Sequence, residues 1–118
     1  MNKPTRQTFL VKLKPGSLER YVRWHDEIWA ELIAEIEGQG IAEISLFEAD
    51  PWVFLYSEVR DTDAWERLWR SEVHARWADE AMKPLMEYGD DGLVDARELS
   101  EIWHFEARYP ATVQESDD

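Results

Sequence analysis

The 118-residue chain has no cysteine, and it has no apolar run near the roughly 20 residues that cross a bilayer. The lack of cysteine excludes disulfides and thiolate chemistry. The polar first residues do not resemble a signal peptide, so we expect a cytoplasmic protein with no membrane partner. The length fits a single domain, residues 1–118, with loose termini at 1–6 and about 110–118.

Basic side chains are scarce relative to acidic ones. The chain has 13 Lys and Arg against 26 Asp and Glu, which gives a formal net charge of −13. This charge repels phosphate backbones, so we expect no nucleic-acid partner. The glycine patterns that hold nucleotide phosphates are missing too, and no cofactor is expected.

A metal or nucleophile site has little support in the sequence. His25, His74 and His104 lie on different predicted elements, and no paired-histidine motif occurs. Successive helix residues point in different directions, so His25, Asp26 and Glu27 cannot converge on one ion. The serines lack the flanking glycines of a nucleophile elbow. We therefore expect no metal, and general acid–base chemistry by histidine remains.

Tryptophan, in contrast, is abundant: the chain has seven. Trp is large and amphipathic, so a small domain this rich in it is expected to have an aromatic-lined pocket, an aromatic interface, or both.

The hydrophobic periodicity predicts an α+β fold. Four strands are expected at residues 7–13, 41–48, 53–59 and 98–107, with a continuous helix over 18–37 and an interrupted helical region from 62 or 63 that Pro84 ends or kinks. The order β-α-β-β-α-β predicts a ferredoxin-like, four-stranded antiparallel sheet with both helices on one face. Apolar residues such as Leu10, Phe47 and Trp103 are left for the other face, which predicts a homodimer through the sheet faces, a dimeric α+β barrel.

The predicted helix over 18–37 carries the main candidate site. Tyr21, His25 and Trp29 are four residues apart, so on a continuous helix they form one row on the apolar face. A histidine between two aromatic rings can give and take protons near neutral pH. A purely structural role, with His25 in the core and Tyr21 and Trp29 as packing, remains an alternative.

The run KLKPGSLERYVRWHDEIWAEL, the later HARW and the final ELSEIWHF resemble the L-rhamnose mutarotase family over about residues 9–105. The resemblance implies a small dimeric enzyme that interconverts the anomers of a 6-deoxyhexose, with His25 as proton donor and Tyr21 and Trp77 as sugar contacts. Trp29 and Arg76 are further candidate contacts, although Trp29 can serve as packing and Arg76 as a structural ion-pair residue. The general base is left open between water, Tyr21 and a carboxylate.

The chain departs from the family pattern at three points. Ala78 follows Trp77 where the family has a second tryptophan, Ile44 stands where a tyrosine contacts the sugar, and the stretch from Trp77 to Met82 is one residue longer. These changes make the pocket less polar. Two alternatives therefore stay open: a cofactor-free oxygenase or cyclase acting on an aromatic molecule, as other dimeric ferredoxin-like proteins are, and a non-catalytic ligand-binding dimer.

Overall fold

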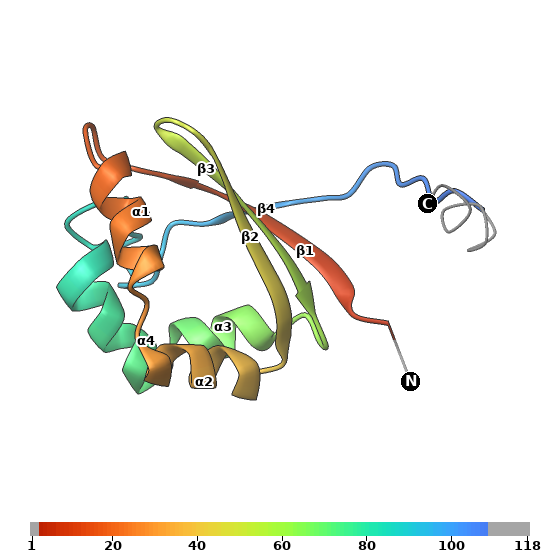
Figure 1. The fold of residues 1–118 in the computed structure, drawn as a ribbon, viewed down its shortest axis with the longest axis horizontal. Helices are drawn as coiled ribbons and strands as arrows, with labels where there is room; N and C mark the ends of the chain where they lie inside the picture. Colours follow the sequence, from red (N-terminus) through yellow and green to blue (C-terminus); the bar gives the residue numbers. More distant parts are fainter. Residues whose placement is uncertain (1–2, 109–118) are drawn as a thin grey trace, which may run out of the picture.

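The computed structural model describes residues 3–108 as an α+β protein with a four-stranded antiparallel sheet (Figure 1). The strands are β1 (Thr5–Lys12), β2 (Ile41–Ala49), β3 (Trp52–Val59) and β4 (Arg97–Leu99). Their order across the sheet is β2-β3-β1-β4, and each neighbouring pair is antiparallel. This is the ferredoxin-like arrangement that the sequence predicted.

Strand alternation separates the two faces of the sheet. Phe9 pairs with Leu55 in the central ladder and both are buried, whereas the next pair, Leu10 and Phe54, points to the opposite face. All the helices lie on the side of the first pair (Figure 1). No helix of residues 3–108 covers the other face of the sheet, and Phe47 and Phe54 are among its exposed large side chains.

The predicted helix over 18–37 is two helices, and this is a correction. α1 (Leu18–Asp26) and α2 (Ala30–Gly38) are separated at Trp29, whose ψ of 137° is extended. The two helices run in different directions in Figure 1. Neither proline nor glycine causes the break; Trp29 instead leaves the helix to pack on a tryptophan of a later helix, so tertiary packing overrides local propensity. The predicted row of Tyr21, His25 and Trp29 therefore ends at His25, and Trp29 does not continue it.

The second helical region is interrupted, as predicted. α3 (Ala64–Trp69) and α4 (Glu72–Trp77) are separated at Ser71, whose hydroxyl caps α4 by accepting from the backbone N–H of His74 at 3.2 Å. α4 continues directly into η1 (Ala78–Met82), a π-helical turn in which the N–H of Lys83 donates to the carbonyl of Ala78 at 2.8 Å.

The final strand is much shorter than the predicted 98–107, which is a second correction. Only Arg97–Leu99 pair with β1, and the chain then runs away from the sheet (Figure 1). Arg6 holds the start of this arm through two hydrogen bonds to Glu101, at 3.0 and 2.9 Å. Beyond them Ile102, Trp103 and Phe105 are 94%, 77% and 67% exposed. The apolar alternation that predicted a strand thus lies on an arm whose large apolar side chains stay exposed among the described residues.

Within residues 3–108 no helix is long and apolar enough to cross a membrane. Of the loose termini predicted at 1–6 and about 110–118, residues 1–2 and 110–118 lie outside the described residues, while β1 already begins at Thr5. The cytoplasmic location stays a prediction.

Candidate active site

A cavity of about 500 Å³ lies between the sheet and the helices. Its walls come from α1, α2, β2, β3 and the region from α3 to η1, and most of them are apolar or aromatic. Ile33, Glu37 and Glu43 line it and are also exposed, so the solvent side of the cavity is between α2 and β2. The volume suits a monosaccharide-sized or small aromatic ligand.

Tyr21 and His25 both line this cavity from α1, as the sequence predicted for one face of that helix. Their ring centroids are 4.5 Å apart. Tyr21 is 6% exposed, and burial raises the pKa of its hydroxyl, so that group is neutral and can donate a hydrogen bond.

The tautomer of His25 follows from one contact. Its Nδ1 lies 2.8 Å from the backbone carbonyl oxygen of Tyr21, and a carbonyl can only accept, so Nδ1 carries the hydrogen. Burial lowers the pKa of the imidazole, against a smaller opposing effect of this hydrogen bond. At neutral pH the ring is therefore uncharged, and Nε2 has a free lone pair.

Trp77 is the centre of an aromatic cluster beside His25. It is 3% exposed, and Trp24, His25 and Trp29 meet its ring edge-on at centroid distances of 5.7, 5.7 and 5.3 Å. Trp77 also lines the cavity. The helix α4 thereby brings one of the predicted sugar contacts next to the predicted catalytic histidine.

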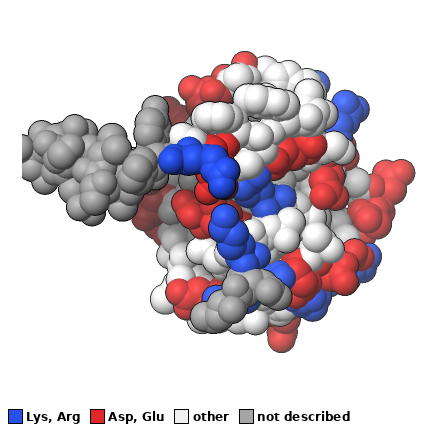
Figure 2. Space-filling view, turned by 90° about the vertical axis from the view of Figure 1, so that its right-hand side faces the viewer, with Lys and Arg blue, Asp and Glu red and all other residues white. Residues whose placement is uncertain are grey.

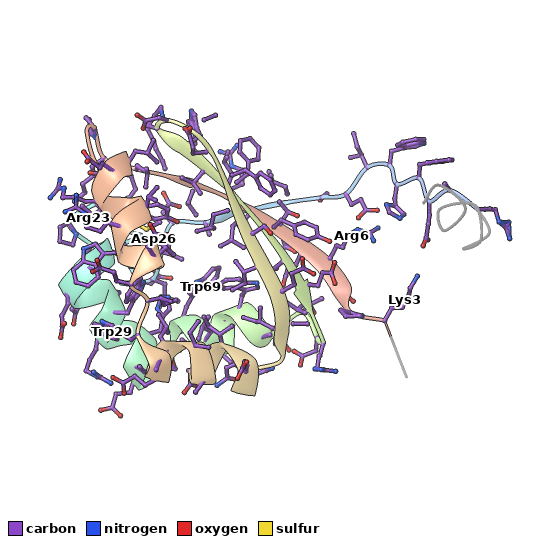
Figure 3. All side chains as sticks on the ribbon, viewed as in Figure 1. Lys3, Arg6, Arg23, Asp26, Trp29 and Trp69 are labelled. Atoms are coloured by element: carbon purple, nitrogen blue, oxygen red, sulfur yellow. The ribbon has the colours of Figure 1, made fainter. Side chains whose placement is uncertain are left out.

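Trp29 and Arg76, in contrast, are not among the residues that line the cavity. Trp29 lies at the junction of α1 and α2, whereas Trp69 lies between the helices and the sheet (Figure 3). The guanidinium of Arg76 donates to Glu31 at 2.9 Å and lies 5.5 Å from the Trp29 ring centroid. Through these contacts Arg76 links α4 to the start of α2. Direct substrate contacts by Trp29 and Arg76 stay a prediction.

Several lining residues were not predicted from the sequence. Trp65 and Trp69 both line the cavity, although the indole N–H of Trp65 is already bonded to Ser57 at 2.9 Å. His74 and Tyr88 were given no role, and both line it too. Spacing could have found His74, which is three residues before Trp77 on the same helix. No local pattern marks Tyr88.

The three departures from the family pattern fall at or beside the cavity. Ile44 lines it, so that wall is apolar. Ala78 is buried and lines a second cavity of about 290 Å³, which shares Trp69, His74 and Tyr88 with the first. The extra residue predicted between Trp77 and Met82 would fall in η1, a π turn that holds one residue more than an α-helical turn.

These features define the protein as a ferredoxin-like α+β protein with a neutral histidine in an aromatic-walled cavity. A profile of the L-rhamnose mutarotase family matches residues 6–105. The chain therefore belongs to the L-rhamnose mutarotase family, a family of isomerases that act at the anomeric carbon.

Relatives of known name agree with this assignment. The chain is 27% identical over 103 residues to the L-rhamnose mutarotase of Oceanobacillus iheyensis, covering 86% of this chain and 98% of that protein. It is 33% identical over 98 residues to that of Acidiphilium cryptum, covering 81% and 93%. The crystal structure of an L-rhamnose mutarotase from Formosa agariphila superposes with a TM-score of 0.75 at 26% identity, covering 86% of this chain and 99% of that one.

A more distant likeness concerns the fold alone. Tetracenomycin F2 cyclase from Streptomyces glaucescens, a type-II polyketide cyclase, superposes with a TM-score of 0.52 at 20% identity, covering 87% of this chain and 98% of that one.

Among residues 3–108 no three His, Asp or Glu side chains gather as they would around a metal ion.

Proposed function

We propose that the protein is an aldose mutarotase that interconverts the α and β anomers of a 6-deoxyhexose such as L-rhamnose, with His25 as its acid–base group. The observation that carries the proposal is the fixed tautomer of His25. Its Nδ1–H is held by the Tyr21 carbonyl at 2.8 Å, so the lone pair of Nε2 is free for substrate in a cavity whose other walls are mainly apolar.

One nitrogen can serve both halves of the reaction. The Nε2 of His25 takes the proton of the anomeric hydroxyl, the bond from C1 to the ring oxygen breaks, and the resulting imidazolium gives the proton to that oxygen. The open aldehyde turns about its C1–C2 bond. Closure runs the same steps in reverse on the other face of C1: Nε2 takes the proton of the ring-forming hydroxyl and returns it to the carbonyl oxygen. The predicted roles of donor and base thus belong to one residue at successive steps.

Tyr21 and Trp77 supply the remaining contacts in this proposal. The neutral hydroxyl of Tyr21 can donate to a sugar oxygen, and the Trp77 ring gives the apolar face of the sugar a surface to pack on. The 6-methyl group of a deoxyhexose needs an apolar wall, and Ile44 provides one.

A second candidate function is favoured by that same apolar lining. Ile33, Ile36, Ile41, Ile44 and Leu46 all line the cavity, and such walls also suit a flat aromatic substrate of a cofactor-free oxygenase or cyclase. This alternative relies on fold analogy, whereas the mutarotase proposal is supported by the family to which the chain belongs.

The test is anomer exchange measured by saturation-transfer NMR on L-rhamnose, L-fucose and D-glucose. We expect faster exchange of the 6-deoxy sugar with the wild-type protein, and a loss of roughly 10²–10⁴ in His25→Gln. Arg23→Gln, an exposed change on the same helix, is the matched control and should keep full activity. If no sugar exchanges faster with the protein than without it, the proposal fails. Thermal protection by an aromatic ligand would then favour the second candidate, and no ligand response would favour a non-catalytic dimer.

We also propose a homodimer through the bare sheet face. Phe47, Phe54, Trp103 and Phe105 are exposed on that face or on the arm beyond β4, more apolar surface than a monomer usually leaves in water. Figure 2, viewed from the end of the sheet where both termini leave, shows uncharged surface in its upper part with charges of both signs below it. Sedimentation equilibrium is expected to give a dimer for the wild type and a monomer for Phe54→Lys; a monomeric wild type would refute the dimer.

A further inference from the structure

His74 is the polar side chain of the cavity that the proposed mechanism leaves without a role. It is half-buried on α4 and lines both the main cavity and the second one beside it. Among residues 3–108 its imidazole nitrogens have no hydrogen-bond or ion-pair partner; only its backbone N–H is bonded, to Ser71. Neither ring nitrogen is among the enclosed, unpartnered polar atoms of the described residues, so the ring is open to the cavities and can hydrogen-bond a ligand there.

The chemistry of the His74 ring limits what that partner can be. Burial lowers its pKa to about 4, with no charged group contributing, so the ring is neutral at physiological pH. A neutral imidazole has one N–H donor and one acceptor nitrogen. It therefore neither attracts an anion nor repels a cation, and it suits a group that can donate and accept, such as a hydroxyl.

His74 lines the second cavity as well as the main one, whereas His25 lines only the main one of these two. Trp77 follows it by three residues on α4 and lies between α4 and α1, with its ring centroid 5.7 Å from that of His25. The other lining residues that the two cavities share with His74 include Trp69, Tyr88 and Val94. A sugar whose C1 is at His25 would thus present another part of its ring to His74.

We propose that His74 is a specificity-determining residue that hydrogen-bonds a sugar hydroxyl other than the anomeric one. This inference rests on the proposed mutarotase function. His74 would then be a polar contact on the α4 wall of the cavity, whereas the β2 wall has the apolar Ile44. The ligand class is a pyranose with free ring hydroxyls, and the hydroxyl bound is one of those on C2, C3 and C4.

The experiment compares His74→Phe, which keeps a planar ring without hydrogen bonding, with His74→Gln, which keeps a donor and an acceptor. Anomer-exchange kinetics are measured on L-rhamnose and on its 2-, 3- and 4-deoxy analogues. We expect His74→Phe to raise KM for rhamnose by roughly tenfold with kcat changed by less than about threefold, because the sugar hydroxyl loses its hydrogen-bond partner on the protein. His74→Gln should recover part of this loss.

The deoxy analogues identify the hydroxyl. For the wild type, the analogue that lacks the bound hydroxyl should have a higher KM than rhamnose. In His74→Phe this difference should disappear, while differences between rhamnose and the other analogues stay. An unchanged KM and unchanged discrimination in a folded His74→Phe would overturn the inference while the mutarotase stands. If His74→Phe does not fold, His74→Leu, which also lacks hydrogen-bonding groups, takes its place, and unchanged KM and discrimination in that variant would overturn the inference.

A binding measurement separates this inference from the proposed reaction. The probe is 1,5-anhydro-L-rhamnitol, which has no anomeric hydroxyl and cannot mutarotate. Its addition to ¹⁵N-labelled wild-type protein should shift the imidazole nitrogen signals of His74, assigned through His74→Gln. A sugar-active wild type whose His74 signals do not respond to the saturating probe overturns the inference, whereas a shift without any anomer exchange would overturn only the proposed reaction.

Discussion

The ring of Trp29 meets the ring of Trp77 edge-on, with their centroids 5.3 Å apart and their planes at 88°. Trp29 stands between α1 and α2, in the break that separates them, and Arg76 covers its ring from α4. The break in the helix and the position of Trp77 are thus coupled through one aromatic contact.

We expect Trp29→Ala to lower the free energy of unfolding by about 2 kcal/mol, because a half-buried indole and its edge-to-face contact are lost. Trp29→Phe keeps an aromatic edge and should cost less than half as much. Urea unfolding followed by circular dichroism measures both. A Trp29→Ala protein as stable as the wild type would show that the contact does not hold the helices together.

The pH dependence of anomer exchange tests the resting state of His25. Its pKa lies below the ordinary value of 6.5, and the neutral ring is the form that starts the proposed reaction. We expect kcat/KM to be flat above neutral pH and to fall as the pH drops through that lowered pKa. A rate that instead rises toward acid would mean that the imidazolium starts the reaction as a donor.

The variant Tyr21→Phe tests whether the Tyr21 hydroxyl affects the protonation of His25. The acceptor for the His25 Nδ1–H is the backbone carbonyl of Tyr21, so removing the hydroxyl leaves the tautomer of His25 in place. The variant should therefore keep the pH profile of the wild type while its KM rises. A shifted profile would show that the hydroxyl itself sets the proton affinity of His25.

The strand order and the face of α1 could be predicted because they depend on local alternation, which is strong in β1, β2 and β3. The helix break at Trp29 could not, since its cause is a ring on a distant helix and no proline or glycine marks it. The shortness of β4 was missed because an exposed apolar arm has the same alternation as a strand. His25, Tyr21 and Trp77 were placed by spacing and resemblance. His74 has the helical spacing of Trp77 but was given no role, whereas Tyr88 enters the cavity only through the tertiary fold.

The burial of His74 makes a prediction about stability in acid. The folded-state pKa is about 4 against an ordinary value of 6.5, so between these values the unfolded chain binds a proton that the folded one does not. Stability from this group is present above about pH 6.5 and is lost as the pH falls toward 4. From about pH 7.5 to about pH 5 the loss is about 2 kcal/mol.

His74→Gln has no titrating group at this position and should lose that much less stability over the same pH range. Urea unfolding at both pH values, for both proteins, gives the difference directly, because all other titrations are common to them. Equal losses in the two proteins would show that His74 is protonated in the folded state as readily as in the unfolded chain.

The π turn η1 makes a prediction about chain length. It takes up one residue more than an α-helical turn, with Lys83 bonded back to Ala78, so that Trp77 before it and Met82 at its end are both buried. Deleting Glu80, which is exposed, should convert the turn to α-helix and keep both flanks in place. We expect a folded protein whose unfolding free energy is within about 1 kcal/mol of the wild type.

Deletion of Glu66 is the matched control, because it too is an exposed glutamate in a helix. α3 has no π turn, so the deletion rotates Leu68 and Trp69 by about 100° relative to Trp65 and drives buried residues toward solvent. That protein should fail to fold or lose more than about 3 kcal/mol. If the Glu80 deletion is as damaging as the Glu66 deletion, the π turn is not a removable insertion but part of the packing that holds Trp77 in the cavity wall.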